Sequence, residues 1–114
     1  MNDCLFCKIA RGEIPSKAVY EDELTFAFRD IAPQTPTHVL VIPKRHIANW
    51  YEARGEEDAL LAGMMRAAAK VAELEGLTES GFRVVSNTCA DARQTVQHLH
   101  MHVMGGCEMT EKMG

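Results

Sequence analysis

Apolar and polar positions alternate along this chain in short runs that are typical of strands. β-Branched and aromatic residues are enriched in these runs, and turn-forming residues separate them. We expect strands over residues 18–21, 24–28, 38–43, 82–87 and a last strand that begins at residue 98. The first two flank the acidic pair Asp22-Glu23 and therefore predict a hairpin.

Two other segments have the pattern of helices. Residues 4–11 form a short helical stretch that Gly12 stops, and a longer one follows the acidic residues 56–58, whose charges complement a helix N-terminus. Gly76 is a suitable terminator for the long helix. Its apolar stripe, which predicts a core or dimer face, consists of Leu60, Leu61, Met64, Ala68, Val71 and Ala72. Together these elements predict an α+β fold in a single domain, residues 1–114: an antiparallel meander of about five strands with one long helix and a short N-terminal helix.

Composition narrows the partners of this protein. Of its 114 residues, 46% are hydrophobic and 25% are charged, with a formal net charge of −4. That acidic balance disfavours broad binding to nucleic acid or to an anionic membrane, so a small anion would have to be held by local donors. We find no apolar run near the ~20 residues of a membrane span and no signal peptide, which predicts a cytoplasmic protein.

The most informative run for function is His98-Leu99-His100-Met101-His102-Val103-Met104. On a strand, the three histidines would line one face and the apolar residues between them the other. A row of imidazoles suits proton transfer, nucleophilic attack or metal binding, because imidazole changes charge near neutral pH. The outer pair would lie ~13 Å apart on a regular strand, so one zinc ion bound by all three is not expected.

A second motif is Cys4-x-x-Cys7 near the N-terminus. Four cysteines in a chain without a signal peptide do not indicate a disulfide framework. The pair is consistent with half of a metal site, with a redox motif or with two small buried thiols. The redox interpretation is weak because no strand precedes Cys4. A tetrahedral zinc would need two more ligands, for which His46 and His98 are candidates.

The histidine run resembles the signature of the histidine triad (HIT) family of nucleotide-binding proteins. Residues 28–47, from Phe28-Arg29-Asp30 to Arg45-His46-Ile47, are similar to a second hallmark of the family's Hint branch, and Cys4-Leu5-Phe6-Cys7 with Glu13-Ile14-Pro15 is similar to its opening. The resemblance covers nearly the whole chain and fades after Gly106. It implies a HIT-like fold, a homodimer and, as in zinc-containing relatives, a structural Zn²⁺ on Cys4, Cys7, His46 and His98.

The resemblance also implies an activity, the hydrolysis of purine nucleoside 5′-phosphoramidates or acyl nucleotides to AMP- or GMP-type products. His100 would be the nucleophile that forms a nucleotidyl-histidine, with its other ring nitrogen bonded to a backbone carbonyl. His102 and His38 would hold phosphoryl oxygens or move protons, and Thr95 and Gln94 would stabilise charge on phosphorus. Asp30 is the expected ribose ligand and Asn87 a phosphate or ribose contact. The purine slot implied by the resemblance comprises Phe6, Ile9, Phe28, Ile31 and Leu40.

Two alternatives stay open at this point. A dinucleoside polyphosphate hydrolase is the nearer one, although His102 stands where that branch usually has glutamine. The other is a nucleotide-binding scaffold dimer with incidental turnover. One departure from the Hint pattern is the segment Ala90-Asp91-Ala92-Arg93, where relatives are glycine-rich, and Arg93 is expected to influence the choice of leaving group.

Overall fold

A single antiparallel sheet organises the computed structural model, which describes residues 4–112. Its strands are β1 (Ala18–Glu21), β2 (Thr25–Arg29), β3 (Thr37–Pro43), β4 (Phe82–Val85) and β5 (Met101–Gly105). The helices are α1 (Leu5–Ala10), the 3₁₀ turn η1 (Glu52–Gly55) and α2 (Asp58–Leu74). The five-stranded antiparallel sheet with one long and one short helix confirms the predicted fold class.

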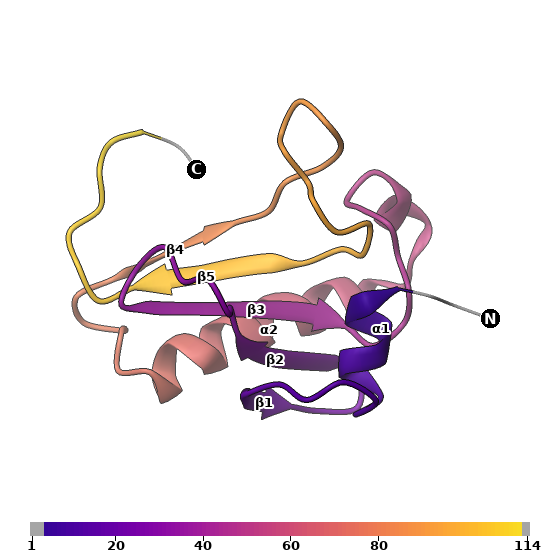
Figure 1. The fold of residues 1–114 in the computed structure, drawn as a ribbon, viewed down its shortest axis with the longest axis horizontal. Coiled ribbons are helices and arrows are strands. Elements are labelled where there is room, and N and C mark those ends of the chain that lie inside the picture. Colours follow the sequence, from indigo (N-terminus) through magenta and orange to yellow (C-terminus); the bar gives the residue numbers. More distant parts are fainter. Residues whose placement is uncertain (1–3, 113–114) are drawn as a thin grey trace.

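The order of the strands, β1-β2-β3-β5-β4, corrects the predicted meander. β1, β2 and β3 are successive antiparallel neighbours, but β5 then pairs with both β3 and β4. The chain leaves β3, crosses one face of the sheet as α2 and places β4 at the far edge (Figure 1). β5 returns into the gap, so the triad strand becomes central, with a neighbour on each side.

Local sequence signals predicted the β1–β2 hairpin and the long helix correctly. The Asp22 carboxylate accepts hydrogen bonds from the backbone N–H groups of Leu24 and Thr25, at 2.9 and 2.8 Å, and so closes the β1–β2 turn. α2 ends at Leu74, and Gly76 adopts the left-handed φ of +72° that a helix terminator requires. Of the predicted apolar stripe, Leu61 is only partly buried and the other five members are buried.

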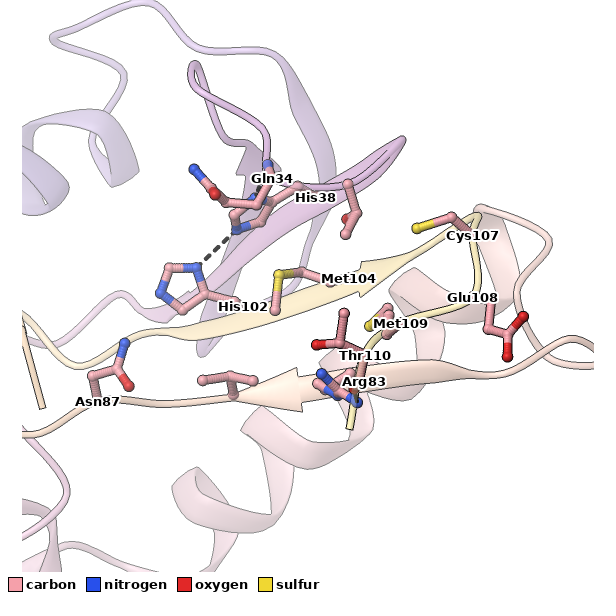
Figure 2. A pocket seen from close by; sticks show the side chains of 12 residues that line it. Gln34, His38, Arg83, Asn87, His102, Met104, Cys107, Glu108, Met109 and Thr110 are labelled. Atoms are coloured by element: carbon pink, nitrogen blue, oxygen red, sulfur yellow. Dashed lines mark hydrogen bonds between the residues drawn. The ribbon is translucent and has the colours of Figure 1, made fainter. Parts of the chain in front are cut away.

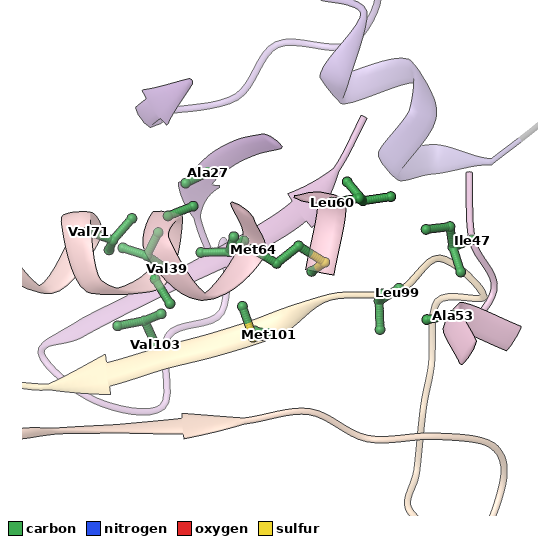
Figure 3. Packing of buried hydrophobic residues seen from close by; sticks show 13 residues of the cluster. Ala27, Val39, Ile47, Ala53, Leu60, Met64, Val71, Leu99, Met101 and Val103 are labelled. Atoms are coloured by element: carbon green, nitrogen blue, oxygen red, sulfur yellow. The ribbon is translucent and has the colours of Figure 1, made fainter. Parts of the chain in front are cut away.

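The main core lies between α2 and one face of the sheet (Figure 3). Met64 and Val71 of α2 pack there against Val39 of β3 and Val103 of β5. Leu40 lies between Val39 and Val41, and His102 lies between Met101 and Val103. Both point to the opposite face because side chains alternate along a strand. On that opposite face a second apolar cluster forms with α1, and it consists of Phe6, Ile9, Phe26, Phe28, Leu40 and Ile42. The sheet therefore has α2 on one face and α1 with the histidines on the other.

The triad strand is shorter than predicted. β5 begins at Met101, so His98 and His100 precede it, and β4 ends at Val85 rather than at residue 87. The alternation nevertheless persists, because Leu99 joins Met101 and Val103 in the core cluster. None of the described helices is both long and apolar enough to span a bilayer.

Candidate active site and metal centre

The two outer histidines of the triad belong to two different clusters, and the third lies between them. His98 turns toward the N-terminal cysteines, whereas His102 turns toward His38 of β3. His100 lies between them, with its ring 5.1 Å from that of His102 and 5.1 Å from that of Phe6. All three side chains lie on the face opposite Leu99, Met101 and Val103, so the difference between them comes from the segments that pack against each one.

The first cluster is the predicted metal site. Cys4 Sγ lies 3.2 Å from His98 Nδ1, and Cys7 Sγ lies 3.4 Å from His98 Nδ1 and 3.3 Å from His46 Nδ1. The four ligand atoms all lie within 4.8 Å of one another. A tetrahedral zinc, with Zn–S near 2.3 Å and Zn–N near 2.0 Å, separates its ligand atoms by roughly 3.3–3.8 Å. The donor set and its spacing therefore fit a metal ion.

The hydrogen bond of His98 supports the same conclusion. Its Nε2–H donates to the carbonyl oxygen of Pro43 over 2.8 Å, so Nδ1 is left as the lone-pair nitrogen that faces the two sulfurs. A carbonyl on the distal nitrogen is the usual support for a metal-binding histidine. Burial lowers the pKa of His98 to about 4, which keeps the imidazole neutral and able to ligate.

His100 has the tautomer expected of a nucleophile. Its Nδ1–H donates to the carbonyl oxygen of His98 over 2.7 Å, so Nε2 carries the lone pair. The ring is buried and stands edge-on to Phe6, at an interplanar angle of 84°. The predicted bond to a backbone carbonyl is thus confirmed, and the residue that provides it is itself part of the metal cluster.

The second cluster joins Asp30, His38 and His102. The backbone N–H of Gln34 donates to His38 Nδ1 over 3.0 Å, which places the proton of a neutral His38 on Nε2. That Nε2–H faces His102 Nδ1 at 2.8 Å and Asp30 Oδ2 at 3.4 Å. His102 Nδ1 is therefore an acceptor, and its own proton lies on Nε2, available to a substrate. Figure 2 shows this line of contacts from Gln34 through His38 to His102.

These hydrogen bonds favour proton handling over metal binding at the second cluster, although its ligand atoms are also close together. A metal on His38 Nε2 would require the proton on Nδ1, where the Gln34 N–H already points. Burial lowers the pKa of His38, with Asp30 acting in the opposite direction. Burial, reinforced by repulsion from His100 and His38, lowers the pKa of His102 to about 4.

A cavity of about 480 Å³ opens beside His38 and His102, between β4, β5 and the segment after β5 (Figure 2). Asn87, a predicted phosphate or ribose contact, lines it. His38 and His102 are also predicted site residues, whereas Arg83 and Val85 were not predicted, although they share the face of Asn87 by simple alternation. The lining comprises Gln34, Thr35, His38, Arg83, Val85, Asn87, His102, Met104, Cys107, Glu108, Met109 and Thr110.

The predicted purine slot is only partly assembled. Phe6, Ile9, Phe28 and Leu40 are buried together next to His100 and do not line the 480 Å³ cavity. Ile9 does line a smaller hollow of about 330 Å³ between α1 and β1. Ile31 is fully exposed in the loop after β2 and lies apart from the cluster.

The loop before the triad corrects one predicted role. The Gln94 side chain is buried and engaged within the protein: its oxygen accepts from the N–H of Cys89, and its nitrogen donates to the carbonyls of Ala48 and Val96. It therefore supports the loop rather than facing a substrate. Thr95 beside it is exposed. Arg93 is also exposed, adopts a left-handed φ of +63° and does not line the cavity.

Comparisons with known proteins agree with this geometry. The HIT domain family matches residues 11–109. The chain is 54% identical to an uncharacterized HIT-like protein of Synechococcus elongatus, over 91% of this chain and 90% of that one. It is 47% identical to the purine nucleoside phosphoramidase of Escherichia coli, over 91% and 87%. The crystal structure of a HIT family hydrolase from Legionella pneumophila superposes with a TM-score of 0.92 at 50% identity, over 96% and 97% of the two chains.

The fold and the paired histidine clusters thus define a histidine triad protein. The chain belongs to the HIT family.

Proposed function

We propose that this protein hydrolyses purine nucleoside 5′-phosphoramidates or related acyl nucleotides, with His100 as the nucleophile. The observation that carries the proposal is the bond from His100 Nδ1–H to the carbonyl of His98, which leaves Nε2 as a lone pair in a buried site. The similarity to the phosphoramidase of E. coli supports the substrate class.

The reaction proceeds in two displacements. His100 Nε2 attacks the α-phosphorus, a P–N bond to the ring forms, and the bond from phosphorus to the departing amine breaks as that amine takes up a proton. Water then cleaves the nucleotidyl-histidine to release the nucleoside monophosphate and restore His100. His102 is placed to donate a hydrogen bond from Nε2 to the phosphoryl group, since its Nδ1 accepts from His38. Thr95 and Asn87 complete the proposed phosphate contacts.

Rapid-quench mixing with adenosine 5′-phosphoramidate tests this chemistry. We expect intact-mass analysis to detect an adenylate adduct that peptide mapping places on His100 and that decays as AMP appears. The His100→Ala variant should form neither adduct nor AMP while still binding AMP. Turnover by that variant would refute the covalent mechanism, and AMP binding without turnover by the wild-type protein would favour a binding module.

Asp30 is the proposed ribose ligand. It is half-buried beside His38, and one of its oxygens accepts from the N–H of Ala32 over 2.8 Å, which fixes the carboxylate in this position. A carboxylate accepts from both ribose hydroxyls at once. Asp30→Ala should therefore weaken binding of AMP more than binding of its 2′,3′-dideoxy analogue. Equal losses for the two nucleotides would remove this role.

We also propose that the cluster of Cys4, Cys7, His46 and His98 holds a structural zinc ion. A closed four-ligand site ties segments together without taking part in the reaction. Here it would join α1 and the segment after β3 to the residue whose carbonyl holds His100. Thiolate ligands of this kind suit a reducing compartment and so support the proposed cytoplasmic location.

Metal analysis of the purified protein tests the zinc site. Cys4→Ser and Cys7→Ser should lower both the zinc content and the melting temperature. The control is Cys107→Ser, which changes an exposed cysteine outside the cluster and should alter neither quantity. Full zinc content in both ligand variants would exclude the site.

Finally, we propose a homodimer formed through the β4 edge of the sheet. Among residues 4–112, β4 has a strand neighbour on one side only. Phe82 and Val84 are 41% and 36% exposed, and their register partners Gly105 and Val103 place them on the face that α2 covers. A second copy that pairs along this edge would bury both side chains and satisfy the free edge of the strand.

A further inference from the structure

The main chain of His100 lies just outside the sheet. The last β3–β5 pair is Val41 with Met101, and the last β4–β5 pair is Val85 with His102. His100 therefore precedes the paired part of β5 on both sides. A nucleophile on unpaired backbone needs another support if its ring is to keep one position, because reaction rates are sensitive to shifts of about 1 Å.

Ser86 provides this support. Its Oγ lies 2.6 Å from the carbonyl oxygen of His100. The indole Nε1–H of Trp50 is hydrogen-bonded to the same Oγ. Because an indole nitrogen can only donate, the Ser86 hydroxyl accepts from Trp50 and gives its own proton to the carbonyl of His100. The direction of both hydrogen bonds is thus determined.

Trp50 is itself well anchored. It is partly buried against the core cluster beneath α2. The segment that carries it also holds Ile47, whose carbonyl accepts the backbone N–H of Leu99 over 2.6 Å. Trp50, which packs against the core, therefore orients the Ser86 hydroxyl. That hydroxyl links the residue after β4 to the residue before β5, just beyond the last paired residues of the two strands.

We propose that Ser86, oriented by Trp50, is a positioning residue for His100. The ring of His100 is held at Nδ1 by the carbonyl of His98, and its main chain is held by Ser86. Together these two hydrogen bonds, one to the ring and one to the main chain, set the direction of Nε2. The Ser86 hydroxyl is engaged by Trp50 and by the carbonyl of His100, so Ser86 acts through His100. The inference rests on the proposed role of His100 as nucleophile.

The test compares Ser86→Ala with Ser86→Thr, which keeps a hydroxyl. In single-turnover reactions with adenosine 5′-phosphoramidate, we expect Ser86→Ala to slow formation of the His100 adduct about tenfold, through misalignment of the nucleophile. KM should stay within about twofold, since substrate contacts are unchanged. Ser86→Thr should restore most of the rate. Trp50→Phe keeps an aromatic ring but removes the N–H, and it should give an intermediate loss.

A second readout does not require turnover. In ¹⁵N-labelled protein, the Nδ1–H resonance of His100 should shift or broaden in Ser86→Ala and stay close to its wild-type position in Ser86→Thr. If the wild-type protein forms no adduct, the proposed function fails, and this resonance still decides whether Ser86 positions the ring.

Three results would overturn the inference: a wild-type adduct rate in Ser86→Ala, equal losses in the alanine and threonine variants, or a loss confined to KM. If Ser86→Ala does not fold, the Trp50→Phe variant decides. A wild-type adduct rate together with an unchanged His100 resonance in that variant would overturn the inference.

Discussion

At the scale of single residues, backbone groups decide which nitrogen of each imidazole carries its proton. The carbonyls of Pro43 and His98 accept from His98 and His100, and the N–H of Gln34 donates to His38. Each bond selects one of two tautomers that are nearly equal in energy in free histidine. The proposed roles of metal ligand, nucleophile and relay follow from these partners and not from the residue type.

His102 makes stability depend on pH. Its folded pKa is about 4, lowered chiefly by burial, against an ordinary value of 6.5. Between these values the unfolded chain binds a proton that the folded protein does not, so this contribution to the free energy of unfolding is complete above pH 6.5 and is lost as the pH falls toward 4. The loss should be on the order of 2–3 kcal/mol.

Urea unfolding from pH 4 to 7 measures this effect. His102→Gln cannot take up the proton, so its stability should fall less steeply over the same window. Because His98 also titrates in this range, the difference between the two proteins, and not the wild-type slope alone, reports on His102. Identical slopes would show that His102 has the same pKa in both states.

Arg93 should be a source of strain. Its φ of +63° lies in the left-handed region, which favours glycine, and this gives a physical reason for the glycine-rich pattern that the resemblance led us to expect there. Arg93→Gly should raise the free energy of unfolding by about 0.5–1 kcal/mol. Arg93→Ala is the control, because alanine keeps the unfavourable conformation. Thermal denaturation that ranks the alanine variant equal to the glycine variant would contradict this account.

At the scale of elements, α2 packs against the face of the sheet that is formed by its central strands, β3 and β5. The helix contributes the small side chains of Ala67 and Ala68 to this core. Its flexible Met64 side chain packs with Val39 and Val103 (Figure 3). These two valines lie on the reverse side of the strands that carry His38 and His102. Core packing and site geometry are therefore coupled through β3 and β5.

Two adjacent methionines of α2 test this packing. Met64 is completely buried and Met65 is 56% exposed. Met64→Ala should lower the free energy of unfolding by about 2–4 kcal/mol through lost contacts and a cavity. Met65→Ala should change it by less than about 0.5 kcal/mol. Chemical denaturation compares the two variants, and similar losses would mean that Met65 is covered in solution.

At the scale of the whole molecule, the free β4 edge of the sheet is the proposed interface of a homodimer. Val84→Lys places a charge on the proposed dimer edge and should shift the protein from dimer to monomer in sedimentation velocity. Leu24→Lys is the matched control, because Leu24 is a similarly exposed apolar residue, at 43%, beside the hairpin at the other end of the sheet. A monomeric wild-type protein, or dissociation by both changes alike, would refute the β4 interface.

Also at this scale, the metal cluster shows what could and could not be predicted. Cys4, Cys7, His46 and His98 come from α1, the segment after β3 and the approach to β5, which are separated by up to 94 residues. Spacing along the chain indicated only half of a metal site at Cys4 and Cys7, and the family resemblance supplied the other two residues. Ser86 gave no signal, and Arg83 gave only the alternation that places it on the face of Asn87, since single polar residues in or beside a short strand are common.

The sequence by itself determined the two α-helices, the approximate position of each strand and the two faces of the sheet, because the periods of 2.0 and 3.6 residues depend only on local backbone geometry. It also determined which reactive groups the protein contains, since imidazoles and thiols are present in any fold of this chain. Only the tertiary structure decided the position of β5 between β3 and β4, the division of the outer triad histidines between two clusters and the proton on each ring. These depend on contacts between distant segments, and no local pattern specifies which carbonyl or amide will meet a given side chain.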